Sequence, residues 1–143
     1  MADLIYENDD GLKASLASKV GKYVEPIGAG TLRLCTAPTT MSQTNVLSDF
    51  SEATFPGYAA VALIGANWTT PTLAAHVASS DYPSITFTRT SGTGSQSITG
   101  WFLTDAGKTK LYACSKFSGG PFIMQNDQDQ IVVTPTLTDE SKN

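Results

Sequence analysis

The sequence predicts an all-β fold, a single antiparallel sandwich or small barrel preceded by an N-terminal arm. The chain has 143 residues, an ordinary size for one domain. Its 12 glycines and 7 prolines separate short threonine-rich apolar segments, a pattern typical of strands joined by turns. We therefore divide the chain into an arm over residues 1–30, a β domain over residues 31–138 and a C-terminal tail over residues 139–143.

The arm differs from the rest of the chain because it combines many charges with a regular apolar pattern. Leucine or valine at every fourth position predicts a short amphipathic helix. Gly11 and Gly21 weaken helix propensity, so an extended arm is the alternative. The apolar side chains of the arm are candidates for docking on a partner: Tyr6, Leu12, Leu16, Val20 and Tyr23.

The first half of the β domain contains two predicted strands and one predicted helical turn. Alternation over Thr31–Thr36 predicts a strand. In Val46–Phe55 we expect one helical turn, with Asp49 as its cap and Glu52 reaching back to the cap. The continuous apolar run Tyr58–Ile64 predicts a strand that is covered on both sides.

Further strands are predicted after an irregular stretch. Residues Gly65–Pro83 carry many small residues and two prolines, so we expect no regular element there. Ser84–Thr90 has the cleanest alternation in the chain, and the turn Ser91–Ser95 follows it. Gln130–Leu137 predicts the last strand, in which Pro135 marks an edge or a strand end.

The stretch Ser97–Phe117 predicts a central hairpin. Its two apolar-rich runs flank Asp105-Ala106-Gly107-Lys108, where Asp and Gly favour a turn. We expect Trp101 to lie opposite Tyr112. Because both faces of this hairpin are apolar, both are expected to be covered.

Charge and hydropathy exclude several classes of protein. A net charge of −4 argues against a nucleic-acid binder, which would be basic. No run approaches the roughly 20 apolar residues of a membrane span. Acidic residues soon after Met1 argue against a secretory leader, so we expect synthesis in the cytoplasm with Cys35 and Cys114 as free thiols.

No stretch carries a catalytic, cofactor-binding or metal-binding pattern. Gly107-Lys108-Thr109 ends like a P-loop, but Phe102 stands where that motif needs glycine. His76 is the only histidine, and the acidic turn at Asp127 and Asp129 lacks the glycine and distal glutamate of a calcium loop. We therefore expect no enzyme, no cofactor and no metal.

An uncharged stretch, Ala53–Ser80, predicts self-association. It contains no Asp, Glu, Lys or Arg, and it is too long to be wholly core in a domain of this size. Its aromatic residues fit either a core or an interface, and depletion of charge is typical of interfaces. The candidate residues for a subunit interface are Tyr58, Trp68, Leu73, Trp101 and Tyr112.

Three strings resemble small virion proteins of tailed bacteriophages. They are SDFSEATFPGYAAVAL (residues 48–63), GWFLTDAGKTKLYACSKF (residues 100–117) and DQIVVTPTLT (residues 129–138). The resemblance implies a virion structural protein, foremost a head cement or decoration protein that contacts the major capsid protein, with a trimer as its oligomeric state. A tail or neck protein is the alternative within this class, and a host- or carbohydrate-binding module is the alternative outside it.

Overall fold

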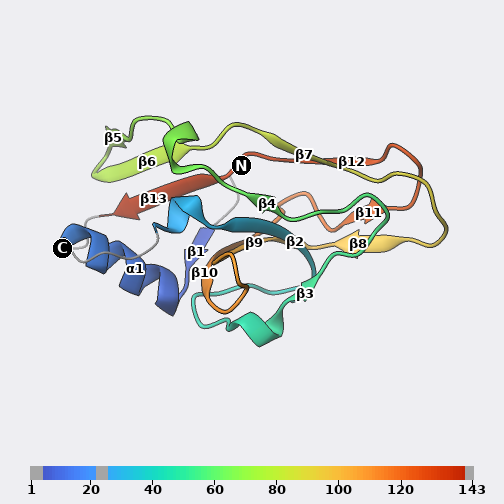
Figure 1. The fold of residues 1–143 in the computed structure, drawn as a ribbon, viewed down its shortest axis with the longest axis horizontal. Coiled ribbons are helices and arrows are strands. Elements are labelled where there is room, and N and C mark those ends of the chain that lie inside the picture. Colours follow the sequence, from blue (N-terminus) through green and yellow to red (C-terminus); the bar gives the residue numbers. More distant parts are fainter. Residues whose placement is uncertain (1–4, 22–25, 141–143) are drawn as a thin grey trace.

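The computed structural model describes residues 5–21 and 26–140, which form two packed layers of antiparallel strands with one α-helix at the side (Figure 1). No closed barrel forms among the described strands. The structure thus confirms the predicted all-β fold as a sandwich.

The larger sheet has the order β1-β10-β9-β2-β3, and β4 also pairs with β2. All of these pairings are antiparallel. Its strands are β1 (Ile5–Glu7), β2 (Thr31–Ala37), β3 (Ser51–Glu52), β4 (Val61–Ala62), β9 (Gly100–Thr104) and β10 (Leu111–Lys116). We call it the main sheet.

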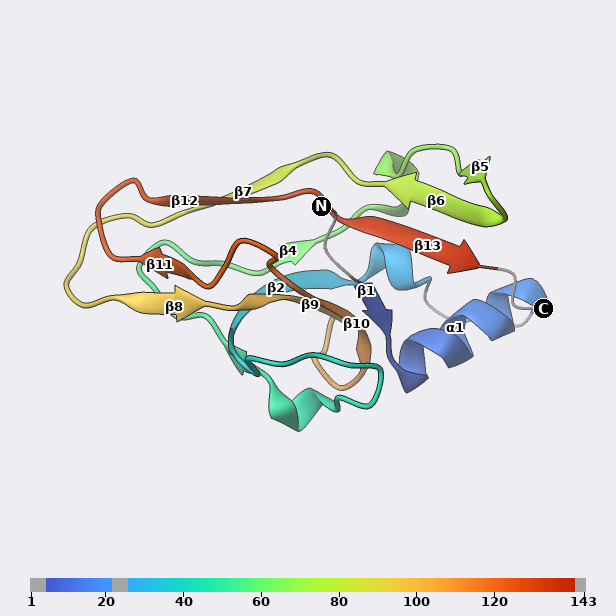
Figure 2. The same cartoon turned by 180° about the vertical axis from the view of Figure 1, so that it is seen from behind.

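The remaining strands form one three-stranded sheet and two ribbons. The sheet has the order β13-β6-β5, and the ribbons are β7–β12 and β8–β11. Their bounds are β5 (Thr72–Ala74), β6 (Val77–Asp81), β7 (Ile85–Thr88), β8 (Gln96–Ile98), β11 (Phe122–Met124), β12 (Gln130–Val133) and β13 (Thr136–Glu140). Figures 1 and 2 show β7 and β12 continuing the layer of β6 and β13, while β8 and β11 lie in the layer of the main sheet.

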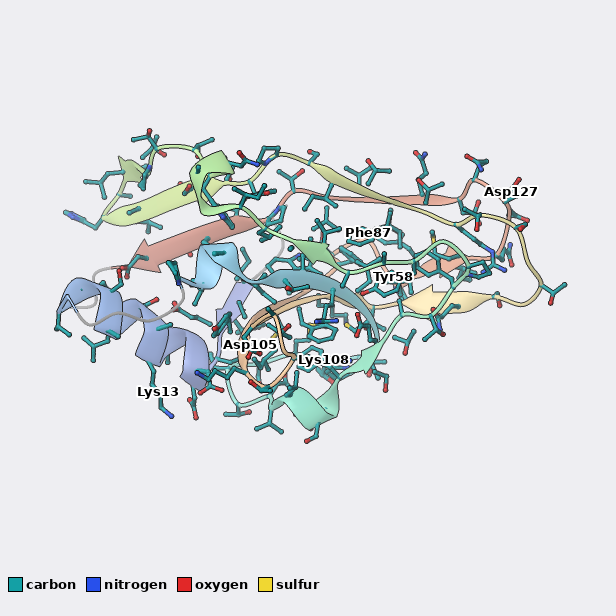
Figure 3. All side chains as sticks on the ribbon, in the orientation of Figure 1. Lys13, Tyr58, Phe87, Asp105, Lys108 and Asp127 are labelled. Atoms are coloured by element: carbon teal, nitrogen blue, oxygen red, sulfur yellow. The ribbon has the colours of Figure 1, made fainter. Side chains whose placement is uncertain are left out.

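An interlayer core lies between the two layers. It combines side chains from strands of the main sheet, from both ribbons and from the loops beside them. Its largest fully buried members are Leu32, Leu34, Ile98, Leu103 and Met124. Half-buried Tyr58 stacks on Phe87 of this core, with ring centroids 5.9 Å apart (Figure 3).

A second core lies on the other face of the main sheet. Phe102 is fully buried there and stacks on Phe50, with ring centroids 4.7 Å apart. Both cysteines belong to this core, which is covered by residues 38–50. All five residues of β9 are buried, so the prediction that both faces of the hairpin are covered is confirmed.

The predicted hairpin is confirmed, but its predicted register is wrong. Trp101 lies opposite Ser115, and the register shifts between Leu111 and Ala113. The shift places one extra residue, Tyr112, in β10, as in a β-bulge. The loop before it is closed by Asp105, whose carboxylate accepts hydrogen bonds from the backbone N–H groups of Thr109 and Lys110 at 2.7 and 2.8 Å.

Residues 58–83 depart most from prediction. Within Tyr58–Ile64 only β4 is a strand, and its Ala62 is exposed, so the strand is not covered on both sides. The stretch expected to be irregular contains the β5–β6 hairpin and a 3-10 helix at Gly65–Asn67. Its two turn residues, Ala75 and His76, have positive φ angles of 50° and 65°, which the sequence does not signal with the usual Asn or Gly.

The helical turn near residue 50 has a different cap from the one predicted. A 3-10 helix spans Leu47–Asp49, so Asp49 ends it rather than beginning it. The carboxylate of Asp49 reaches back and accepts a hydrogen bond from the N–H of Val46 at 2.9 Å. Glu52 lies in β3 and binds other groups, described below.

The last described residues of the chain belong to a strand. The predicted last strand Gln130–Leu137 is divided into two: β12 ends at Val133, and β13 starts directly after Pro135, which marks the break. Asp139 and Glu140 belong to β13, where we expected a C-terminal tail, because that strand pairs with β6 through Glu140. The strands predicted at Thr31–Thr36 and Ser84–Thr90 are confirmed as β2 and β7.

Candidate functional site

The arm is built into the β domain. Its strand β1 pairs with β10 and forms the end of the main sheet. Asn8 follows directly and is 2% exposed. Its amide nitrogen donates to the carbonyls of Ser42, Gln43 and Asn45, at 3.1 to 3.3 Å. Its backbone N–H donates to the carbonyl of Tyr112 at 3.0 Å. The arm therefore joins the edge of the sheet to the segment that covers the second core.

Helix α1 (Asp9–Lys19) follows Asn8 and faces β10 through its small residues. Gly11 and Ala14 are its buried members. A Cβ at position 11 would overlap the carbonyl oxygen of Tyr112, so only glycine permits this approach of helix to strand. The helix is therefore held against the sheet by backbone proximity and not by large apolar side chains.

The large apolar residues of α1 and its C-cap point outward. Leu12, Leu16 and Val20 are 50%, 62% and 63% exposed. Their spacing places them on one stripe of the helix, and Lys13 and Lys19 flank it on either side of a helical wheel. Figure 3 shows Lys13 pointing away from the domain. We call Leu12, Leu16 and Val20 the helix stripe.

The structure separates the predicted arm residues into two groups. The helix stripe was predicted from its spacing and is exposed. Tyr6 is half-buried and packs against the second core, so it holds the arm in place and is not free to dock. Tyr23 lies outside the described residues. The sequence did not lead us to Asn8 or to the packing role of Gly11. Small residues on the side of a helix opposite its apolar stripe could have indicated that the small-residue side faces the domain.

The predicted subunit-interface residues do not gather on one surface. Trp101 and Tyr112 are each 3% exposed in the interlayer core, so they do not form a surface contact. Tyr58 is half-buried there. Trp68 is half-buried, donates from Nε1 to the carbonyl of Gly28 at 2.7 Å and packs edge-on against a tyrosine ring. These aromatic residues stabilise the fold.

Leu73 alone of these candidates is well exposed, at 74%. It lies in β5, an edge strand of its sheet among the described strands. Every residue from Thr69 to His76 is exposed, and none is Asp, Glu, Lys or Arg. We call residues 69–76 the neutral edge.

One charge network joins three parts of the main sheet. The Glu52 carboxylate accepts hydrogen bonds from Arg33 Nη1 at 3.0 Å, from Lys108 Nζ at 2.7 Å and from the Tyr58 hydroxyl at 2.7 Å. Burial works against ionisation, but these three donors together lower the pKa of Glu52. Burial and the Glu52 bond raise the pKa of Tyr58 well above its usual range. Each charge has a partner, so the network is structural and offers no free acid or base.

Neither cysteine thiol is activated, and the described residues form no metal site. Burial raises the pKa of Cys35 to about 11 and that of Cys114 to about 12, which keeps both thiols protonated at neutral pH. No group of three His, Cys, Asp or Glu side chains within residues 5–21 and 26–140 is placed to hold a metal ion. In the same part of the chain, no helix has the length and apolar character needed to cross a membrane.

Comparison with known proteins gives no relative: no family model, no curated protein and no solved structure matches the chain. The two candidate contact surfaces of the described chain are the helix stripe and the neutral edge.

Proposed function

We propose that the protein is a non-enzymatic assembly protein that docks on a larger particle through the helix stripe. The observation that carries this proposal is the orientation of α1, which turns its small residues to its own domain and its large apolar residues outward. A helix that stabilises only its own domain has the opposite orientation. Anchors at i, i+4 and i+8 are the pattern of a helix that lies in an apolar groove of a partner.

The charges beside the helix stripe indicate which side chains a partner groove would carry. Lys13 and Lys19 flank the stripe, so carboxylates at the rim of the groove complement it. Burying the exposed parts of the three stripe side chains contributes roughly 3–5 kcal/mol, at about 1.5–3 kcal/mol for each fully buried side chain. A contact of that strength is weak for one copy, because association itself has an entropic cost. It becomes effective where many copies bind one assembled surface.

We propose further that this surface is a bacteriophage head and that the chain acts there as a cement or decoration protein on the major capsid protein. The support is the resemblance of residues 48–63, 100–117 and 129–138 to small virion proteins. A protein that binds only the assembled lattice stabilises that lattice by mass action. Placement in the tail or neck is the alternative, and cryo-electron microscopy of the particle distinguishes the two.

Self-association belongs to the same proposal, with the neutral edge as the contact and a trimer as the state. Two copies of a chain with a net charge of −4 repel each other electrostatically, and this repulsion is smallest when the surface of contact carries no charge. Leu73→Glu at the neutral edge tests this, because Leu73 is exposed and Trp68 is tied into the fold. Light scattering of the wild type and variant, free and on the particle, gives the answer. A wild type that is monomeric in both settings refutes self-association.

The docking experiment measures co-sedimentation of the purified chain with undecorated heads of the same virus. We expect Leu16→Glu to weaken binding at least tenfold, since it places a carboxylate in an apolar groove rimmed by carboxylates. Val132→Glu is the matched control, because Val132 is 58% exposed in β12, which is remote from α1 in Figure 1. Circular dichroism confirms that each variant is folded. Equal binding by the Leu16→Glu variant and the control refutes docking through the helix stripe.

A host- or carbohydrate-binding module is less well supported. Such modules stack sugars on exposed aromatic rings, and the two tryptophans are buried or tied into the fold. Phe122, at 40% exposed, is the one large aromatic side chain among the markedly exposed apolar residues of the described chain.

A further inference from the structure

A pocket of about 300 Å³ lies between the arm and the three-stranded sheet. It is lined from one side by β1, α1 and the 3-10 helix Ile27–Ala29, and from the other by β6 and β13. Of the docking surfaces described above, it shares only Pro71 of the neutral edge. Its lining residues are Ile5, Glu7, Ser15, Ile27, Pro71, Ala78, Ser79, Ser80, Leu137, Thr138 and Asp139.

The lining combines an aliphatic wall with two carboxylates. Ile5, Ile27 and Leu137 are partly buried and supply apolar surface. Glu7 and Asp139 supply the carboxylates, and serine and threonine hydroxyls lie between them. None of the described residues that line the pocket is aromatic, so they offer no stacking surface of the kind that sugar sites use.

The two carboxylates share one cation. Lys19 Nζ lies 2.7 Å from the Asp139 carboxylate. The hydrogen bond and charge of Asp139 raise the pKa of Lys19, and the charge of Glu7 adds to this effect. Glu7 accepts a short hydrogen bond from the Ser15 hydroxyl, and none of the ion pairs among the described residues includes it. Among the described residues, Glu7, Asp139 and Lys19 therefore give the pocket one net negative charge.

We propose that this pocket binds a primary ammonium group carried on a short aliphatic chain, with the ammonium at Glu7 and the methylene groups against Ile5, Ile27 and Leu137. Such a ligand matches both halves of the lining, since a charged head pairs with a carboxylate while its stem covers apolar surface. The volume is at the lower end of ligand pockets, which suits a chain of a few methylene groups. The same chemistry is offered by a free diamine and by a lysine side chain of another protein.

Lys19 competes with the proposed ligand. Its own ammonium group is bound to Asp139 at the wall of the pocket, so it competes with an incoming ammonium for negative charge. Removing the charge of Lys19 therefore strengthens binding, whereas removing the charge of Glu7 weakens it. A nonspecific attraction of cations to an acidic protein would not depend on Glu7 more than on another carboxylate.

The test is a nuclear magnetic resonance titration of the full chain with two probes, 1,5-diaminopentane and Nα-acetyl-lysine methylamide. We expect saturable shifts of the Ile5, Ile27 and Leu137 methyl signals with at least one probe. Glu7→Gln is expected to weaken binding about tenfold, the effect of losing a hydrogen bond to a charged group. Lys19→Gln is expected to strengthen it about threefold, the scale of an exposed ion pair.

Asp127→Asn is the matched control, because Asp127 is exposed and lies at the end of the molecule opposite α1 in Figure 3. We expect the control to bind as the wild type does. The proposal is overturned if neither probe gives saturable shifts at these methyl groups, or if Glu7→Gln and Asp127→Asn weaken binding equally. A preference for the lysine derivative assigns the pocket to a protein side chain, and a preference for the diamine assigns it to a free amine. Because no particle is present, failure here leaves docking through the helix stripe unaffected.

Discussion

Replacing Gly11 by alanine is expected to destabilise the protein even though alanine is the better helix former. The new Cβ would overlap the carbonyl oxygen of Tyr112, a backbone atom that cannot turn aside. Overpacking of this kind costs about 1–3 kcal/mol. Higher helix propensity returns at most about 1 kcal/mol. We therefore expect a net loss of about 1–2 kcal/mol and a melting temperature lower by about 3–6 °C.

The assay combines thermal unfolding with amide hydrogen exchange, since α1 can separate locally from β10 before the whole domain unfolds. Gly65→Ala is the matched control, because nothing lies within 4 Å of a Cβ at that position. We expect that variant to differ from the wild type by less than about 0.5 kcal/mol. If Gly11→Ala unfolds at or above the temperature of the wild type, with full protection of α1, then close backbone approach at Gly11 does not hold the helix against β10.

Three further predictions concern stability and reactivity. The lowered pKa of Glu52 means that its contribution to stability is present above its usual value of 4.5 and is lost as pH falls through the folded-state pKa. Glu52→Gln should therefore lower the urea midpoint at neutral pH and make its acid dependence shallower, and an unchanged slope would contradict this. Cys35 and Cys114, with pKa values raised to about 11 and about 12, should react slowly with Ellman's reagent in the native state. Two thiols should titrate after denaturation, and rapid native reaction would show that the second core is open. His76→Gly should stabilise the folded chain by about 0.5–1 kcal/mol. His76 has a positive φ angle, and this left-handed conformation costs a non-glycine residue about 1–2 kcal/mol. Part of the gain is lost because glycine makes the unfolded chain more flexible. A lower urea midpoint would argue against positive φ at that turn.

The sequence predicts a strand of the sandwich well where its residue pattern is compatible with only one structure. Alternation in β7 and the apolar character of both faces of β9 led to the observed burial. Register is different, because it depends on the geometry of the loop. The hydrogen bonds of Asp105 and the extra residue at Tyr112 set the pairing, and neither follows from hydropathy.

Hydropathy also does not predict which side of α1 faces the domain. The spacing of Leu12, Leu16 and Val20 predicts an apolar stripe, but a stripe alone does not say whether it faces the domain or solvent. Gly11 decides the question, because it allows the opposite side of the helix to approach β10. Aromatic content was a poorer guide to surface contacts, since Trp101 lies in the core while Leu73 is exposed. The pairing of strands far apart in the sequence determines which of these residues is buried, and local sequence does not reveal that pairing.

The place of β1 in the main sheet has a consequence for how the chain is made. Ile5 pairs with Ser115, 110 residues later in the sequence. At roughly 5–20 residues per second, the ribosome needs about 5–20 s to deliver the partner strand after the arm has emerged. During that interval the arm has no β10 to pair with, and its apolar residues face solvent together with those of the unfinished sheet. Closure of the sheet is thus a late event in synthesis, and such long-range pairing is intrinsically slow. A chain truncated before β10 should leave the arm open to protease, whereas the complete chain should protect it.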